Sequence, residues 1–266
     1  MRRSLSAGLI TLALALCWSG TALADPNNDY AGSHMPRSGR QLVPPDAVFS
    51  AQKRVVGPDV SNHQGCSLDW NVIAKRRNFA FMKASEGLTF TDACFDRNWR
   101  QSRAVHLPRG AYDFAHPNPD ISTARFEADY FVSVVKSSGG FHNALPPVLD
   151  IEVNDFSMRR GQIRSWIRAW IDEIRRHTKR KTVVIYTFQD YWNMNVGKWR
   201  PKNVMLWGAR WSTAQPEMVG WKHVNWWQYT DGSFGPKPHK CPGIGYSDQS
   251  FWLGSKSALR TVQHTP

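Results

Sequence analysis

The 266-residue sequence has few acids, few cysteines and no long apolar run beyond its first 24 residues. It carries 21 Asp and Glu against 34 Lys and Arg, which gives a formal net charge of +13. Hydrophobic residues make up 41% and charged residues 21%, so the chain is not a disordered polyelectrolyte. With no internal repeat and no low-complexity block, it is also not a collagen, a coiled coil or a histone-like tail. Thirteen Trp, 7 Tyr and 13 Phe instead indicate a globular domain that is rich in aromatic side chains.

Several motifs for metal and nucleophilic chemistry are missing. No His-x-x-x-His or Cys-x-x-Cys spacing occurs, which disfavours a zinc site. Neither a Gly-x-Ser-x-Gly elbow nor a phosphate-binding glycine-rich loop is present, and no cysteine has the flanks of a known nucleophile motif. We therefore expect a protein that uses neither a metal nor a cofactor.

The first 24 residues have the pattern of a secretory signal peptide. Arg2 and Arg3 form a positive start, residues 7–18 are apolar, and small residues before Ala24 supply a cleavage site after it. The apolar run is shorter than the roughly 20 residues that cross a bilayer. We expect a secreted protein, extracellular or periplasmic, with no stable membrane insertion. Cleavage removes two arginines and no acid, which lowers the net charge from +13 to +11.

Residues 25–54 predict a flexible leader, because they are rich in Pro, Asn, Ser, Gly and Arg and show no sustained periodicity. After cleavage three cysteines remain, Cys66, Cys94 and Cys241. In an oxidising compartment two of them can form a disulfide, and the sequence leaves open which two.

From residue 55 onward, short apolar runs alternate with helical patterns. Two helices are indicated at residues 122–136 and 162–177, each with apolar side chains along one side. Several of the apolar runs are continuous, which is typical of strands buried on both faces. The alternation predicts a parallel sheet, and over about 210 residues it favours a closed α/β barrel. The expected strands are 55–60, 79–83, 110–114, 147–151, 182–187, 204–209 and 224–229.

Acidic residues occur near the ends of two expected strands and in one late segment of the sequence. Asp59 lies near the end of the first expected strand, Asp150 and Glu152 at the end of the fourth, and Asp248 in the segment 247–252. In α/β barrels the chemistry takes place at the carboxyl ends of the strands. Asp150 and Glu152 are two residues apart, so on a strand they point to the same side, and two carboxyls in one pocket cannot both ionise easily. Cleavage of a glycosidic bond needs such a pair, although Asp-x-Glu is also compatible with a cap or a solvated loop.

Five ordered sequence blocks carry a family resemblance. They are Asp-Val-Ser-Asn-His-Gln-Gly at 59–65, Phe-Met-Lys-Ala-Ser-Glu-Gly at 81–87, Gly-Ala-Tyr-Asp-Phe-Ala-His-Pro at 110–117, the apolar run into Asp-Ile-Glu at 145–152, and Trp-Gln-Tyr-Thr at 227–230. With the closing Asp248, they resemble glycoside hydrolase family 25, the Chalaropsis-type lysozymes, over essentially the whole mature domain. The resemblance implies a single TIM-like (β/α)5β3 barrel, with residues 55–266 as the catalytic domain. It also implies N-acetylmuramidase activity on the β-1,4 bond between N-acetylmuramic acid and N-acetylglucosamine in bacterial peptidoglycan.

The resemblance also implies roles for individual acids. Glu152 matches the general acid, and Asp150 matches a partner that orients a substrate group or stabilises the charged intermediate. Asp59 and Asp248 match the flanking acids of the pocket.

Substrate-binding residues are implied in the same way. Tyr112 and Trp227 match aromatic walls of a sugar groove, and we add Gln228 and Tyr186 to the substrate-binding set. For Lys83 and Glu86, a buried salt bridge and a contact with substrate both remain open.

Three other functions compete with this interpretation. A chitinase-type barrel needs two further acids upstream of Asp150, where this chain has Leu145 and Val148. A non-catalytic saccharide-binding protein on the same barrel is expected to lose Asp150 or Glu152, and both are present. A nucleic-acid binder is suggested by charge alone, because the basic residues are scattered. We therefore expect a monomeric enzyme that acts on peptidoglycan and whose positive charge attracts it to an anionic cell wall.

Overall fold

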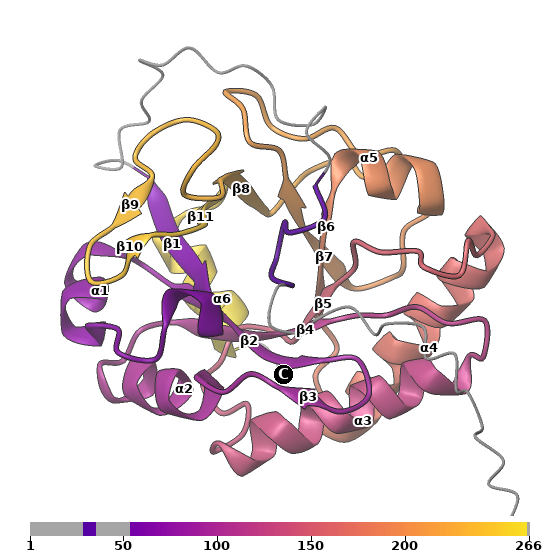
Figure 1. Ribbon diagram of the computed structural model, residues 1–266, viewed down its shortest axis with the longest axis horizontal. Coiled ribbons are helices and arrows are strands. Elements are labelled where there is room, and N and C mark those ends of the chain that lie inside the picture. Colours follow the sequence, from indigo (N-terminus) through magenta and orange to yellow (C-terminus); the bar gives the residue numbers. More distant parts are fainter. Residues whose placement is uncertain (1–28, 36–53, 265–266) are drawn as a thin grey trace, which may run out of the picture.

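The computed structural model describes residues 29–35 and 54–264, and residues 54–264 form a closed α/β barrel with helices around it (Figure 1). The expected signal peptide, residues 1–24, and most of the expected leader lie outside the described residues. None of the helices in the described part of the chain is long and apolar enough to cross a membrane.

Eight strands close the barrel, because β1 pairs with strands on both of its sides. Around the barrel they are β1 (Val55–Val60), β2 (Ala80–Glu86), β4 (Arg109–Phe114), β5 (Val148–Asp150), β6 (Val183–Phe188), β7 (Val204–Ala209), β8 (Trp226–Thr230) and β11 (Gln249–Trp252). The pairs from β1 through β8 are parallel, whereas β11 is antiparallel to both β8 and β1. Short strands β3 (Phe90–Thr91), β9 (Lys240–Cys241) and β10 (Gly245–Tyr246) add to this frame.

Helices connect most of the parallel strands and lie outside the barrel (Figure 1). They are α1 (Trp70–Arg76), α2 (Phe95–Ala104), α3 (Ser122–Ser137), α4 (Arg160–Thr178), α5 (Gln189–Tyr191) and α6 (Lys256–His264), with short turns η3 (Asn62–Gln64) and η4 (Trp192–Val196). Between β7, β8 and β11 the connections carry no α-helix. Each long helix buries one apolar side against the strands, as the i, i+3, i+4 spacing of its side chains predicts.

The inside of the barrel is filled mainly by aromatic side chains. Phe81 from β2 stacks on Trp207 from β7 with ring centroids 4.4 Å apart, and Tyr186 from β6 meets the same indole edge-on at 4.5 Å. Gly110 on β4 lies under Phe81, and a Cβ at this position would come within 2.4 Å of the phenyl ring. The barrel is therefore a packed core, and only its ends can hold a site.

The predicted α/β barrel is confirmed, and the seven expected strands and two expected helices are all present with ends shifted by a few residues at most. The finer (β/α)5β3 description stays a prediction. Strand β11 and helices α1, α2 and α6 were not expected. These elements are short, and the ends of β11 depend on pairing partners that lie far away in the sequence.

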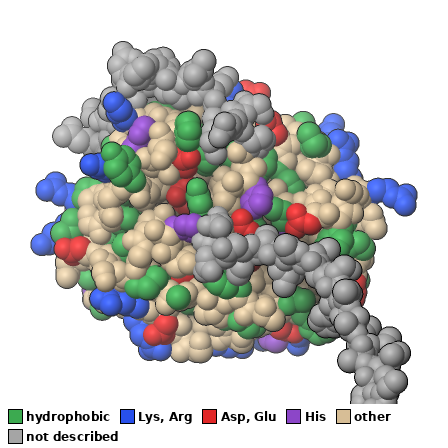
Figure 2. All heavy atoms as spheres, viewed as in Figure 1, with side chains coloured by type: hydrophobic (Ala, Val, Ile, Leu, Met, Phe, Trp, Pro, Cys, Tyr) green, Lys and Arg blue, Asp and Glu red, His purple; other side chains and the backbone are tan. Residues whose placement is uncertain are grey.

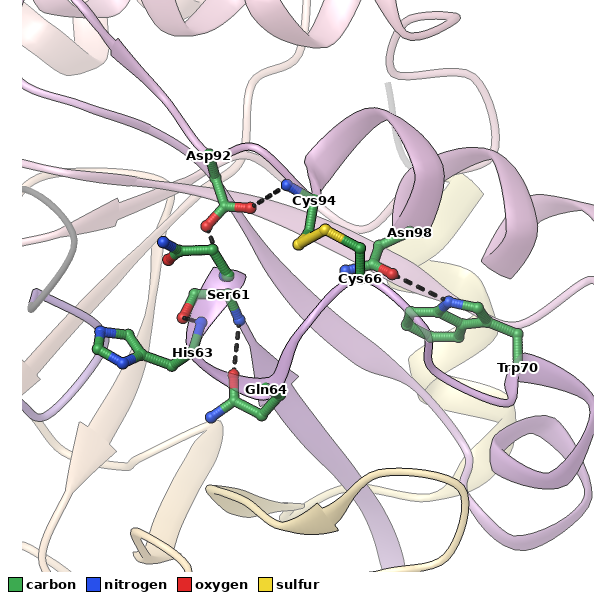
Figure 3. Close-up of a disulfide and its surroundings, with 9 residues drawn as sticks. Ser61, His63, Gln64, Cys66, Trp70, Asp92, Cys94 and Asn98 are labelled. Carbon is green, nitrogen blue, oxygen red and sulfur yellow. Dashed lines mark hydrogen bonds between the residues drawn. A yellow bond between two sulfur atoms is a disulfide. The ribbon is translucent and has the colours of Figure 1, made fainter.

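The structure also settles which cysteines pair (Figure 3). Cys66, after η3, forms a disulfide with Cys94 at the start of α2, and Cys241 is free and buried. Beside the disulfide, the carboxylate of Asp92 accepts hydrogen bonds from the backbone N–H groups of Asn62 at 2.7 Å and Cys94 at 2.9 Å. The loop that follows β1 is thereby fixed to the segment that leads into α2.

Candidate active site

The four predicted acids meet at one end of the barrel. Asp150 is the last residue of β5, Glu152 follows it by two residues, and Asp59 lies near the end of β1. Asp248 precedes β11, and because β11 is antiparallel to its neighbours, its beginning lies at the end of the barrel where the other strands finish. Each of these acids is at most 3% exposed. Figure 2 shows red and purple side chains gathered in the middle of this face, with Lys and Arg toward its outline.

Gln228 on β8 joins two of these acids. Its Nε2 donates to both oxygens of Asp59 at 3.3 Å and lies 3.4 Å from Oδ1 of Asp248. Its Oε1 accepts hydrogen bonds from the Tyr186 hydroxyl at 2.8 Å and from Nε1 of Trp211 at 2.9 Å. The amide therefore has a fixed orientation, with its donor side toward the carboxyls.

Burial raises the pKa of every acid in this group. Removal from water, together with the charge of Glu152, raises the pKa of Asp59 to about 8, and burial raises that of Glu152 to about 7. Burial and the neighbouring carboxyls raise the pKa of Asp150 and of Asp248 well above the usual range. Close to neutral pH the group therefore holds several protons, and Glu152 is poised to give one up.

Residues Asp29–Met35, which we call the docked segment, lie against these acids. Figure 1 shows this indigo piece of chain in the centre of the molecule, between β1 and β6. The backbone N–H of Gly32 donates to Oε1 of Glu152, and the N–H of His34 donates to Oε2 at 3.1 Å. Ala31 and Met35 of this segment are 0% and 4% exposed. We expected the leader to be flexible, and the structure differs for these seven residues because their backbone donors and apolar side chains fit the mouth of the barrel.

Two barrel side chains hold the docked segment by its carbonyl oxygens. Nζ of Lys83 donates to the carbonyl of Asp29 at 2.7 Å, and Nε2 of Gln228 donates to the carbonyl of Ala31 at 3.1 Å. The Lys83 ammonium also forms a buried ion pair with Glu86 at 2.5 Å. Of the two alternatives for Lys83 and Glu86, the buried salt bridge is present.

The two tyrosines of the predicted substrate-binding set lie in the barrel at this end. Tyr112 on β4 and Tyr186 on β6 are fully buried, and burial raises the pKa of both phenols well above 10. The Tyr112 hydroxyl has no hydrogen-bond partner among the described residues.

Trp227 is placed differently from its prediction as a wall of the groove. It is next to Gln228 on β8, and successive side chains of a strand point to opposite faces. Its ring packs with Val56, Tyr229 and Phe251 in a separate apolar cluster, and its Nε1 donates to the carbonyl of Arg210 at 2.9 Å. The prediction for Trp227 is corrected: the indole supports the sheet on the face away from Gln228.

Trp211 takes the position at the acids that we predicted for Trp227. It is 1% exposed, bonds to Gln228 and lies so close to Gly32 that a Cβ there would come within 2.7 Å of its Cζ2. We did not predict Trp211 at the acids from the sequence. Its role depends on the course of the loop, which no local pattern encodes.

Two side-chain clusters in the described residues have the ligand types for a cation. They are Asp29, Glu86 and His116, and Asp129, Glu173 and His177, with ligand atoms within 4.8 Å of one another in each. Lys83 forms an ion pair with Glu86, and Arg176 forms one with Glu173. In each cluster a basic side chain therefore already balances the charge of one carboxylate. These contacts account for both clusters as ion-pair networks.

Comparison with known proteins identifies the family of this chain. Residues 58–236 match the model of the family described as Glycosyl hydrolases family 25. Lysozyme M1 of Streptomyces globisporus is 32% identical over 255 residues, 84% of this chain and 82% of that protein. An N,O-diacetylmuramidase of Arthroderma benhamiae is 28% identical over 189 residues, 66% of this chain and 77% of that protein. The crystal structure of a bacterial lysozyme from Streptomyces coelicolor has a TM-score of 0.69 and 31% identity, covering 80% of this chain and 98% of that one.

Proposed function

The chain belongs to glycosyl hydrolases family 25, and from this membership we propose that it is a lysozyme. It is an N-acetylmuramidase that hydrolyses the β-1,4 bond between N-acetylmuramic acid and N-acetylglucosamine in bacterial peptidoglycan. The meeting of Glu152 with three further buried acids at the strand ends carries this proposal.

Glu152 acts as the general acid. A general acid must hold a proton at working pH and yet release it to the leaving oxygen, which requires a pKa near that pH. Burial raises the pKa of Glu152 to about 7, so a large part of the enzyme carries the proton at neutral pH. The same carboxyl group in water, with a pKa near 4.3, would be almost fully ionised.

The other acids surround the position where positive charge develops on the sugar. Asp150 lies next to Glu152, and burial together with the charge of Glu152 raises the pKa of Asp150 well above its usual range. Asp59 and Asp248 share the donor of Gln228, which orients both carboxyls toward the same space. When Glu152 gives up its proton, the negative charge on this group stabilises an oxocarbenium-like transition state.

Aromatic and amide side chains around the acids bind the sugars. Tyr112, Tyr186 and Trp211 present ring surfaces close to the acids, and apolar sugar faces pack well on such rings. The basic surface attracts the enzyme to anionic cell walls, an attraction that salt weakens. The first 24 residues direct the chain to secretion, and the enzyme works as a monomer.

The test is digestion of purified peptidoglycan by the full chain and by a Glu152→Gln variant. The amide keeps the shape of the carboxyl but has no proton to donate, so we expect a loss of turnover of at least about a hundredfold. Mass analysis of the fragments should give reducing-end muramic acid. The matched control is Glu217→Gln, which removes an exposed carboxyl far along the chain and should retain wild-type turnover.

Three outcomes would contradict the proposal. Reducing-end glucosamine or cleaved peptide would reject the bond specificity. Full turnover by Glu152→Gln would reject the assignment of the acid. Binding of peptidoglycan by the wild-type chain without any new reducing ends would favour the saccharide-binding alternative.

A further inference from the structure

The docked segment covers the carboxyl group that must reach the substrate. We propose that Asp29–Met35 is an intramolecular inhibitor of the active site, a plug that must leave before peptidoglycan can bind. This inference rests on the proposed function, because it assigns Glu152 the role of the acid.

Both oxygens of Glu152 are used by the plug. Oε1 accepts the N–H of Gly32, and Oε2 accepts the N–H of His34. Two donors of this kind stabilise the ionised carboxylate, since a carboxylate only accepts hydrogen bonds and a protonated carboxyl must also donate one. A general acid needs the opposite condition, with its proton directed at the glycosidic oxygen. In the docked state these two donors lower the pKa of Glu152 against the effect of burial, and both of its oxygens face the plug where a substrate would have to lie.

The plug also uses a second group of the proposed machinery. The amide of Gln228, which contacts Asp59 and Asp248, donates to the carbonyl of Ala31. The side chains of Asp29 and His34 bond to each other at 2.7 Å and brace the turn between them. The segment therefore fills the space directly in front of the acids with its own backbone.

Position 32 of the plug accepts only glycine. Its φ is +96°, and a Cβ would lie 2.7 Å from Trp211, 3.0 Å from the Tyr186 hydroxyl and 3.1 Å from Gln228. Because three buried side chains surround that point, a larger residue cannot be accommodated by one rotamer change. Substitution at Gly32 consequently displaces the plug while leaving every barrel residue unchanged.

The plug and the barrel are parts of one chain, so docking is an equilibrium that does not depend on protein concentration. The apparent affinity for substrate equals the intrinsic affinity multiplied by the fraction of molecules in which the plug is released. A polymer that engages many subsites can compete with the plug, whereas a short oligosaccharide competes less well. We therefore expect inhibition to be strongest on short soluble substrates.

The decisive experiment compares the full wild-type chain with Gly32→Val. The matched control is Gly161→Val, because Gly161 has an ordinary φ and no heavy atom near its Cβ position. On a short soluble muramic-acid oligosaccharide, kcat/KM of Gly32→Val should exceed the wild-type value at least about tenfold, and that of Gly161→Val should equal it. Added in excess, the peptide Asp-Tyr-Ala-Gly-Ser-His-Met should inhibit Gly32→Val competitively, and a scrambled peptide should not.

Amide hydrogen exchange measures docking without reference to activity. The N–H groups of Gly32 and His34 should be protected in the wild-type chain, and His34 should lose protection in Gly32→Val. Equal kcat/KM values for Gly32→Val and wild type, a lower value for Gly32→Val, or unprotected wild-type amides would each overturn the plug. Absence of turnover in all three proteins, with the wild-type amides still protected, would instead overturn the proposed function.

A basic cleft at the opposite end of the barrel supports a second, independent inference. It has a volume of about 840 Å³ and lies between α1, α2, α6 and the start of β4. No Asp or Glu lines it. Its permanently charged lining residues are Arg77, Arg100, Arg103, Arg109, Lys256 and Arg260, of which Arg100 forms an ion pair with the nearby Asp96 at 2.7 Å.

Arg109 is the most deeply buried arginine of this lining. It is 2% exposed, its guanidinium lies 4.3 Å above the ring of Trp99, and no described carboxylate lies within ion-pair distance of it. Its Nε and Nη2 have no hydrogen-bond partner among the described residues. Arg77, 8% exposed, also lines the cleft; its Nη1 donates to the carbonyl of Arg76 at 3.1 Å, its Nη2 donates to Oε1 of Gln249 at 2.7 Å, and its Nε has no hydrogen-bond partner among the described residues. Buried cations without an acid are costly, and an anion bound in the adjoining cleft lowers that cost through its charge.

We infer that this cleft binds a phosphate-bearing anion. Several guanidinium groups around one space match the oxygens of phosphate, and the volume is large enough for more than one phosphate unit. Free phosphate and the phosphodiester of an anionic wall polymer share this chemistry. The face lies away from the acids, so binding here would leave the active site open.

Calorimetric titration of the full chain with inorganic phosphate and with a poly(glycerol phosphate) tests this inference. Arg103→Gln/Arg260→Gln should weaken binding roughly tenfold or more, and the control pair Arg125→Gln/Arg159→Gln, at exposed positions outside the cleft, should not. Saturation by inorganic phosphate alone identifies free phosphate as sufficient, and binding of the polymer alone identifies the phosphodiester. No binding of either probe, or equal weakening in both double variants, would overturn the site.

Discussion

Raising the pH from about 5 to about 7 should lower the free energy of unfolding, because buried carboxyls at the active site are protonated in the folded chain and ionised in the unfolded one. Asp59 shows the effect most clearly. It is 2% exposed, and burial raises its pKa from 3.8 to about 8. A carboxyl whose pKa is raised by folding stabilises the fold fully below its unfolded pKa, and that stabilisation is lost as the pH rises through the folded pKa.

The size of the effect follows from the number of protons bound. Between about pH 5 and 7 the unfolded chain has lost the proton of Asp59 and the folded chain still holds it. One such group lowers the free energy of unfolding by about 1.4 kcal/mol per pH unit, or about 3 kcal/mol over the interval. Asp150 and Asp248, whose pKa values burial also raises, add in the same direction.

Histidines and ion-paired acids do not reverse the sign. The hydrogen bond with the carboxyl of Asp29 raises the pKa of His34. The contribution of His34 to stability is therefore also lost as the pH rises. The ion pair with Arg176 lowers the pKa of Glu173, so its contribution is present above about pH 4 and stays constant over the interval.

Urea unfolding followed by tryptophan fluorescence at several pH values measures the slope. The Asp59→Asn variant, which cannot titrate at this position, should reduce the fall by about 1.4 kcal/mol per pH unit. Asp190→Asn, at an exposed position, should keep the wild-type slope. A wild-type stability that is constant or rises between pH 5 and 7, or an unchanged slope in Asp59→Asn, would refute the reasoning.

Two further substitutions test the frame of the barrel. Removing the disulfide with Cys66→Ser/Cys94→Ser opens a loop with a sequence separation of 28 residues and should cost roughly 3 to 4 kcal/mol in denaturant unfolding; a loss below 1 kcal/mol would count against this estimate. Gly57→Ala places a Cβ 2.2 Å from the backbone oxygen of Phe79 and should cost about 1 to 3 kcal/mol or more, whereas Gly161→Ala should not destabilise; equal melting temperatures for the two variants would contradict the packing.

Local patterns in the sequence were enough for seven of the eight barrel strands and for two helices. Continuous apolar runs such as 183–188 are buried on both faces, and the stripe of apolar residues on α4 faces the strands. Strand β11 was missed as a strand because four residues between loops carry little periodic signal, and pairing with β1 and β8 determines its extent.

For the site, the sequence predicted the acids but not how they are brought together. Asp150 and Glu152 are near neighbours in the chain, so their joint position follows from the strand alone. Asp248 meets Asp59 only because β11 runs antiparallel and brings its beginning to the end of β1. Trp227 was predicted at the groove because a motif fixes an order of residues, whereas the register of β8 fixes the face on which each side chain lies.

The sequence by itself determined most of the barrel strands, the two longest helices, the acids and the family, since each of these depends on residue types at short spacing. Only the tertiary structure decided that Cys66 pairs with Cys94, that Trp211 lies at the acids, and that Asp29–Met35 dock on Glu152. These contacts join residues that are 28, 17 and about 120 positions apart. They form because a closed barrel brings distant chain segments to one end, and no local propensity contains that information.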